Sequence, residues 1–248
     1  MDNLSLLYKL ALIIGAIANL FMAASLLAGQ KPYRKYVIYS RARQFTILWL
    51  AAFALGYLIH AFLELRVIWP TAATAVTVSY FHIGAICFCW GYIPLLNPDY
   101  LTRRIAVRDT VIYAIELISC WTMAFIWKEQ NIYTALPFLL FFGYCAYNVV
   151  IFYKTFHRVS FRLLMMSYGN VRGFVRWMQL SCDIIIFFGI FLVALVLLFP
   201  NAIRLFTPIE AIAGIGLFAY IVRSISRYGK VVEDATRATE NVAEFNKK

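Results

Sequence analysis

The chain has 248 residues, of which 63% are hydrophobic and only 14% are charged. A soluble domain has about 45–50% apolar residues and needs far more charge than this to cover its surface. The composition therefore excludes a soluble enzyme, a disordered chain and a disulfide scaffold, and it predicts an all-α polytopic membrane protein.

Seven apolar stretches are long enough to cross a bilayer, because a helical span needs about 20 residues. The runs are continuous rather than alternating, which argues against membrane strands. Short links, such as the one around Pro70, make consecutive helices antiparallel neighbours. The sequence predicts a seven-transmembrane-helix bundle over residues 1–226, with spans at about 6–29, 45–68, 72–96, 110–127, 135–154, 177–199 and 205–225.

The basic residues predict how this bundle sits in the membrane. All but four of the 23 Lys and Arg residues fall in the first, third and fifth links or after the last span. Cytoplasmic loops carry the excess of positive charge, so we expect the N-terminus outside and the C-terminus in the cytoplasm, in a bacterial inner membrane. The net charge of +11 would then face anionic lipid headgroups, and nucleic acid is not expected as a partner.

Ionisable side chains inside the spans mark the first candidate site, because they are expensive in hydrocarbon. His60 precedes Pro70 and His82 follows it by similar numbers of residues, so counting along the helices from this link places both imidazoles at nearly one depth. Glu64 lies one turn from His60 on the same helix face. We expect an outward-facing polar pocket that binds a small ligand or a proton, lined by Lys9, Tyr57, His60, Glu64, Tyr80, His82 and Glu210.

Other interpretations of these residues stay open at the level of sequence. The histidines could simply hydrogen-bond across helices and hold the bundle together. A b-type haem would use His60 and His82 as axial ligands, and a metal ion would use them together with Glu64. No cofactor is favoured among these possibilities.

A second polar set lies nearer the cytoplasm and consists of Glu116, Asn148 and Asp183. A small-solute or proton transporter would need polar groups at both levels. The favoured interpretation is that Glu116 and Asp183 pair with Asn148 or nearby hydroxyls and support helix packing. The sequence contains no Walker loop, GxGxxG, HExxH or GxSxG motif, so an enzyme is not expected.

Residues 227–248 are predicted to form a cytoplasmic amphipathic helical tail. Apolar residues recur there at the spacing of a coiled-coil seam; they are Val231, Ala235, Ala238, Val242 and Phe245. Two heptads are marginal alone, so the alternative is a solvated helix lying on the membrane. A dimer seam would make this tail an output helix, coupled to a homodimer mate or to a cytoplasmic signalling partner.

The segment Asn97-Pro98-Asp99-Tyr100-Leu101-Thr102-Arg103-Arg104, within a multi-span bundle, resembles the membrane-embedded sensor halves of Bacteroidota regulators. In those regulators the bundle precedes a histidine-kinase or AraC-type DNA-binding domain. No such domain follows Lys248 here, so the resemblance implies an output carried by a partner. It implies a membrane sensor or signal-relay module; the alternatives are a b-type haem or quinone-linked redox protein, and a small-solute or proton transporter.

Overall fold

The computed structural model describes residues 3–129, 133, 136–166, 172–198 and 203–245, with the side chains of 3–4, 162–166, 172–175, 190, 192–198, 203–205 and 235–245 outside that description. The described residues form helices and no strand, which confirms the all-α prediction. The elements are α1 (Asn3–Ala28), η1 (Lys31–Tyr33), α2 (Val37–Leu63), α3 (Leu65–Ile68), α4 (Pro70–Leu96), α5 (Arg103–Ile126), α6 (Leu136–Met166), α7 (Arg172–Leu198) and α8 (Ile203–Phe245).

Six of the described helices are long and apolar enough to cross a membrane, and they indicate a multi-pass membrane protein. They are α1, α2, α4, α5, α6 and the part of α8 from Phe206 to Asp234. The remaining predicted span, 177–199, falls on α7, and the side chains of 192–199 in it lie outside the described residues.

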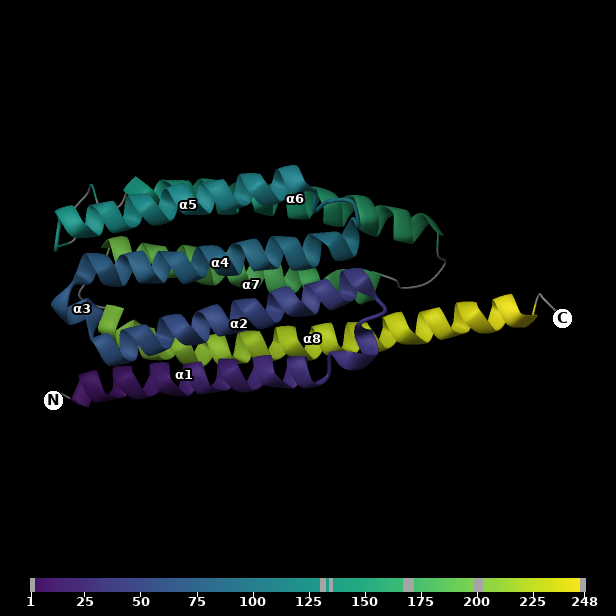
Figure 1. Cartoon of the computed structure of the whole chain (residues 1–248), viewed down its shortest axis with the longest axis horizontal. Helices are drawn as coiled ribbons and strands as arrows, with labels where there is room; N and C mark the ends of the chain where they lie inside the picture. Colours follow the sequence, from purple (N-terminus) through teal and green to yellow (C-terminus); the bar gives the residue numbers. More distant parts are fainter. Residues whose placement is uncertain (1–2, 130–132, 134–135, 167–171, 199–202, 246–248) are drawn as a thin grey trace.

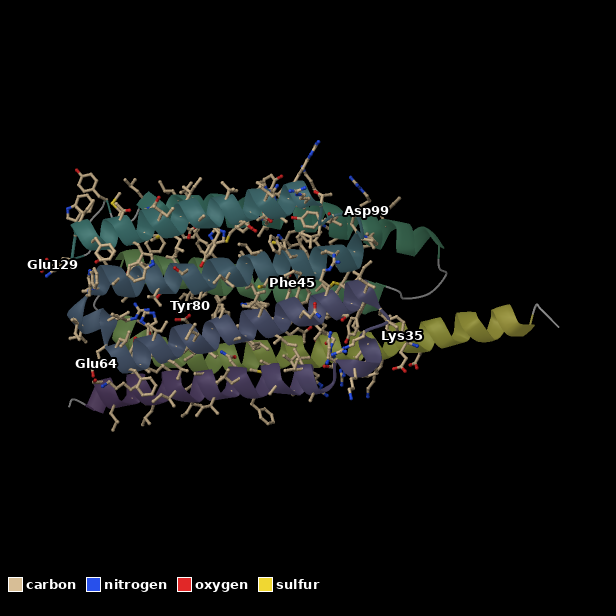
Figure 2. The ribbon with its side chains drawn as sticks, in the orientation of Figure 1. Lys35, Phe45, Glu64, Tyr80, Asp99 and Glu129 are labelled. Atoms are coloured by element: carbon tan, nitrogen blue, oxygen red, sulfur yellow. The ribbon has the colours of Figure 1, made fainter. Side chains whose placement is uncertain are left out.

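The long helices run antiparallel in chain order, so the links alternate between two ends of the bundle (Figure 1). We name these ends after residues that Figure 2 labels there: the Glu64 end also carries Glu129, and the Lys35 end also carries Asp99. Helix α1 begins at the Glu64 end, whereas α8 leaves the bundle at the Lys35 end and ends well beyond it (Figure 1).

Helix α4 is the central helix, since 67% of its most apolar 18-residue stretch is buried inside the protein. It packs against α2 on one side and against α5 and α6 on another, while α1 packs against both α2 and α8. The larger hydrophobic core lies mainly among α1, α2, α4 and α8, and a smaller one lies among α4, α5 and α6.

Local sequence explains where the helices around the Glu64 end begin and end. Helix α2 ends at Leu63 because Glu64 adopts a left-handed conformation with φ 48°. Pro70 occupies the first turn of α4, where its missing N–H costs nothing. The short helix α3 fills the link between them, so α2 ends five residues earlier than the predicted boundary at 68.

Candidate functional site

An ion pair ties α1 to the end of α2 at the Glu64 end. Lys9 Nζ contacts Glu64 Oε1, and both side chains are partly exposed. Glu64 is also the one residue other than glycine with a positive φ among the described residues. Such a conformation costs about 1–2 kcal/mol for an L-residue, and residues held in it cluster at functional sites.

A hydrogen-bonded group of His60, Thr77 and Arg66 lies next to this pair. Thr77 Oγ1 donates to the Ala73 carbonyl (2.9 Å), so its one proton is already used. It must therefore accept the bonds from His60 Nε2 (3.0 Å) and from Arg66 Nη2 (3.4 Å). His60 consequently carries its hydrogen on Nε2, and its buried Nδ1 has no hydrogen-bond partner.

Two tyrosines connect this group to α8. The Tyr80 ring lies 6.2 Å from the His60 ring and 6.1 Å from the Tyr57 ring, measured between centroids. Glu210 of α8 interacts electrostatically with both tyrosines and with Arg66. Six of the seven residues predicted to line the outer pocket thus gather at the Glu64 end, which Figure 2 marks with Glu64 and Tyr80.

His82, the seventh predicted residue, lies elsewhere. It follows the His60 partner Thr77 by five residues on α4, which places it about 7.5 Å deeper and about 140° around the helix. The expectation of equal depth for the two histidines was wrong because α3 takes up part of the link and α2 ends only three residues after His60. The structure does not bring His60 and His82 together as a haem pair, and the described residues contain no group of three metal-ligating side chains.

A buried imidazole–carboxylate pair occupies the second polar cluster. His82 Nδ1 contacts Glu116 Oε2, and both residues are almost completely buried. The His82 ring lies 4.5 Å from the Tyr144 ring and 5.2 Å from the Tyr113 ring. This pair therefore joins α4 to α5 in a site packed by α6, away from the Glu64-end cluster.

The three residues of the predicted cytoplasmic set have separate partners. Glu116 contacts His82, and Asp183 accepts a hydrogen bond from Tyr153. Asn148 donates to the Tyr144 carbonyl (2.9 Å) and accepts from the Tyr100 hydroxyl (3.3 Å). The expected partners of Glu116 and Asp183 were Asn148 or nearby hydroxyls: Asp183 has such a hydroxyl partner in Tyr153, whereas Glu116 contacts the imidazole of His82 instead.

Asp109 was missed by the sequence interpretation because it directly follows Arg108 and looked like part of a loop. It is fully buried. Its Oδ2 accepts a hydrogen bond from Trp90 Nε1 (2.8 Å), and its Oδ1 accepts one from Arg108 Nη2 (2.7 Å). The carboxylate thus ties the Lys35 end of α5 to α4.

Arg43 was missed for a similar reason, since it was counted as an anchor in the first link. It is 3% exposed and donates to the Leu26 carbonyl (2.6 Å), to Gln30 Oε1 (2.9 Å) and to the Tyr39 hydroxyl (3.2 Å). These acceptors allow the guanidinium to be buried at the junction of α1 and α2.

Helix α2 holds α8 at two levels through tyrosines on one face. Tyr39 and Tyr57 are 18 residues apart, which is about five helical turns. The Tyr57 hydroxyl lies 3.5 Å from the position of a Cβ at Gly214, and the Tyr39 hydroxyl donates to the Ile225 carbonyl (2.7 Å). A Cβ at Gly229 would lie 2.1 Å from the Tyr39 hydroxyl, so glycine is required for this contact.

Comparisons with protein-family models, with curated proteins and with solved structures give no match for this chain.

Proposed function

We propose that this chain is a membrane-embedded sensor or signal-relay module. In this proposal a small ligand or a proton binds among Lys9, Tyr57, His60, Glu64, Tyr80 and Glu210, and α8 carries the change to the opposite side of the membrane. The observation that carries the proposal is the continuity of α8, which runs without a break from Ile203 to Phe245 and is held by α2 at two levels.

The topology in this proposal has seven spans, α7 included, with the N-terminus outside and the C-terminus in the cytoplasm of a bacterial inner membrane. Two features support it. Helix α1 begins at the Glu64 end, and α8 leaves the bundle at the Lys35 end (Figure 1). A chain that enters at one end and leaves at the other crosses the bundle an odd number of times. All but four of the 23 Lys and Arg residues lie in the links at the Lys35 end, in the helix ends next to them or in the tail, as expected for a cytoplasmic side.

The Glu64-end cluster is suited to respond to a ligand because its charges are incompletely paired. Lys9 and Glu64 form a partly exposed ion pair, while the charge of Arg66 acts on both Glu210 and Tyr80. A polar or charged ligand that competes for Arg66 or Glu64 would alter the force on Glu210. Because Glu210 and Gly214 are one turn apart on α8, that force acts close to Gly214, beside which the Tyr57 hydroxyl lies.

The proposed output is the tail of α8, through homodimerisation or a cytoplasmic signalling partner. Val231, the first residue of the predicted seam, is exposed and available for such a contact. The side chains of Ala235, Ala238, Val242 and Phe245 lie outside the described residues.

The proposal is tested by removing the Glu210 charge and observing the tail. A spin label is placed by Val242→Cys in a variant whose five native cysteines are replaced by alanine. We expect Glu210→Gln to change the mobility of the label or the distance between labels in two copies of the chain. Adding Tyr57→Phe should reduce this effect, because it removes the hydroxyl that touches α8.

The matched control is Glu129→Gln, which removes the same charge from an exposed residue at the same end. It should leave the tail label unchanged. If Glu210→Gln folds normally and the label behaves as in the Glu129→Gln protein, the Glu64-end cluster is not coupled to the tail and the relay is wrong.

A further inference from the structure

The buried pair in the α4–α5–α6 unit has a chemistry that the proposed relay does not use. His82 and Glu116 contact one another through Nδ1 and Oε2. Their other polar atoms, His82 Nε2 and Glu116 Oε1, are buried without hydrogen-bond partners, and so is the adjacent Tyr144 hydroxyl. Three unpartnered polar atoms in one buried cluster are unusual, because buried polar groups are nearly always hydrogen-bonded.

The electrostatics of the pair favour one bound proton. The titratable groups facing it are Tyr113 and Cys120 of α5 and Tyr144 and Cys145 of α6, and these are neutral in their protonated forms. With one proton the pair has no net charge; with none or two it would leave a net charge buried in the bundle. Burying an unpaired charge is far more expensive than burying a neutral pair, and the proton belongs to the pair rather than to either residue.

Polar side chains lie on one side of the pair, toward the Lys35 end. Asn148 lies one turn along α6 from Tyr144, and its Oδ1 accepts the Tyr100 hydroxyl (3.3 Å). Burial raises the pKa of Tyr100, which lies in the link between α4 and α5, so this hydroxyl stays protonated. Beyond it lies the partly exposed Arg108. A series of hydrogen-bonding groups thus leads from the interior to the surface.

Apolar side chains lie on the other side of the pair, toward the Glu64 end. They precede His82 on α4, follow Glu116 on α5 and precede Tyr144 on α6, and they form one buried cluster of Ala75, Val78, Cys120, Phe138 and Phe141. This cluster offers only the weakly polar Cys120 thiol to a proton or a water molecule. Beyond this cluster the buried Thr71 and Thr74 of α4 lie nearer the Glu64 end, and Thr71 Oγ1 donates to the Trp127 carbonyl (2.7 Å). The apolar cluster therefore separates the pair from the polar groups at that end.

We propose that His82 and Glu116 form an internal proton-binding site that holds one exchangeable proton and exchanges it with solvent from the Lys35 end. The proton moves between the imidazole and the carboxylate, whose Nδ1 and Oε2 atoms are in contact. No net charge is created in this movement, since the proton leaves one partner and arrives at the other. The site is separate from the Glu64-end cluster, so it can be present whether or not the proposed relay is correct.

The first experiment follows the three histidines of the unmodified chain by nitrogen-15 NMR during a titration from mildly acidic to mildly alkaline pH. His60→Gln and His157→Gln assign the signals and leave the proposed site intact. We expect the His82 signal to stay constant over this range, because the pair holds one proton throughout; the signal of the exposed His157 serves as the reference. Glu116→Gln should change the His82 signal, whereas Glu64→Gln, the matched control, should not. If His82 titrates together with His157, the shared proton does not exist.

The second experiment measures how fast the shared proton exchanges with deuterium, by infrared spectroscopy. The signals of the pair are those that differ between the unmodified chain and Glu116→Gln. We expect Tyr100→Phe to slow exchange by about fivefold, the rate equivalent of one lost hydrogen bond of about 1 kcal/mol. Two controls should leave the rate unchanged: Tyr133→Phe, the same change at an exposed tyrosine at the Glu64 end, and Phe138→Leu on the apolar side. No exchange at all, or slowing by Phe138→Leu instead of Tyr100→Phe, would overturn the proposal.

Discussion

Gly229→Ala is expected to destabilise the protein strongly, because it places a methyl group against the tyrosine that holds α8. The new Cβ would lie 2.1 Å from the Tyr39 hydroxyl and 2.5 Å from Cζ of the same ring. The ring has little room to move, since Tyr39 is 3% exposed and its hydroxyl is bonded to the Ile225 carbonyl and to Arg43. Something must shift for alanine to fit.

The magnitude follows from the two contacts that are disturbed. Overpacking a well-filled interior costs about 1–3 kcal/mol, and loss of the hydrogen bond from Tyr39 to Ile225 costs about 1 kcal/mol. Against this, alanine is better than glycine inside a helix by up to about 1 kcal/mol. The matched control Gly216→Ala has that gain without the cost, because nothing lies within 4 Å of a Cβ at Gly216. The two variants should therefore differ by about 2–4 kcal/mol.

The assay is reversible unfolding of the purified protein in mixed detergent micelles, followed by circular dichroism. Gly229→Ala should unfold at a clearly lower denaturing detergent fraction than the unmodified chain, and Gly216→Ala at the same or a higher one. Tyr39→Ala combined with Gly229→Ala should show less than the sum of the two single losses, because the clash disappears with the ring. Equal stabilities for the two glycine variants would refute the close contact between α2 and α8.

Further variants test individual contacts by the same unfolding assay. Lys9→Gln should cost no more than about 1 kcal/mol, because its ion pair is partly exposed, and the loss should shrink with added salt. Thr77→Val should cost about 1–3 kcal/mol, since it leaves His60 Nε2 buried without its acceptor; a neutral result would show that His60 finds another partner. Asp109→Asn should weaken the bonds from Trp90 and Arg108, cost about 1.5–3 kcal/mol as expected for hydrogen bonds to charged groups, and alter Trp90 fluorescence. Tags at the two termini should be accessible from opposite sides of the membrane, and accessibility from one side would refute the proposed orientation.

The sequence predicted the helices well because each is a long apolar run with an obvious interruption. The predicted helix boundaries were wrong where charged residues lie inside a helix. Helix α2 begins at Val37 rather than at 45, because Arg43 finds carbonyl, amide and hydroxyl acceptors in the bundle. The sequence does not show that an arginine will find these acceptors, because they belong to residues 4 to 17 positions away.

Part of the candidate site could also be predicted from the sequence. Lys9, His60, Glu64 and Glu210 could be placed at one end by counting residues, since helix rise is constant. Counting misplaced His82 because it could not see that part of the link folds as α3. Close contacts such as that of Gly229 with Tyr39 determine which face of a helix packs against which neighbour. The rotation of each helix about its axis cannot be read from a single sequence.

The length of α8 makes it a lever arm. Its 43 residues extend about 65 Å, roughly twice the thickness of the hydrocarbon layer. If Gly229 acts as the fulcrum, Phe245 lies 16 residues, or about 24 Å, beyond it. A tilt of about 10° at the fulcrum would sweep the tip through about 4 Å, a displacement comparable to the spacing between neighbouring side chains in a coiled coil. Gly214 lies 15 residues, or about 22 Å, on the other side of Gly229, so the same tilt moves it by about 4 Å in the opposite direction, and the arm transmits a displacement of this size from one end of the bundle to the tip of the tail.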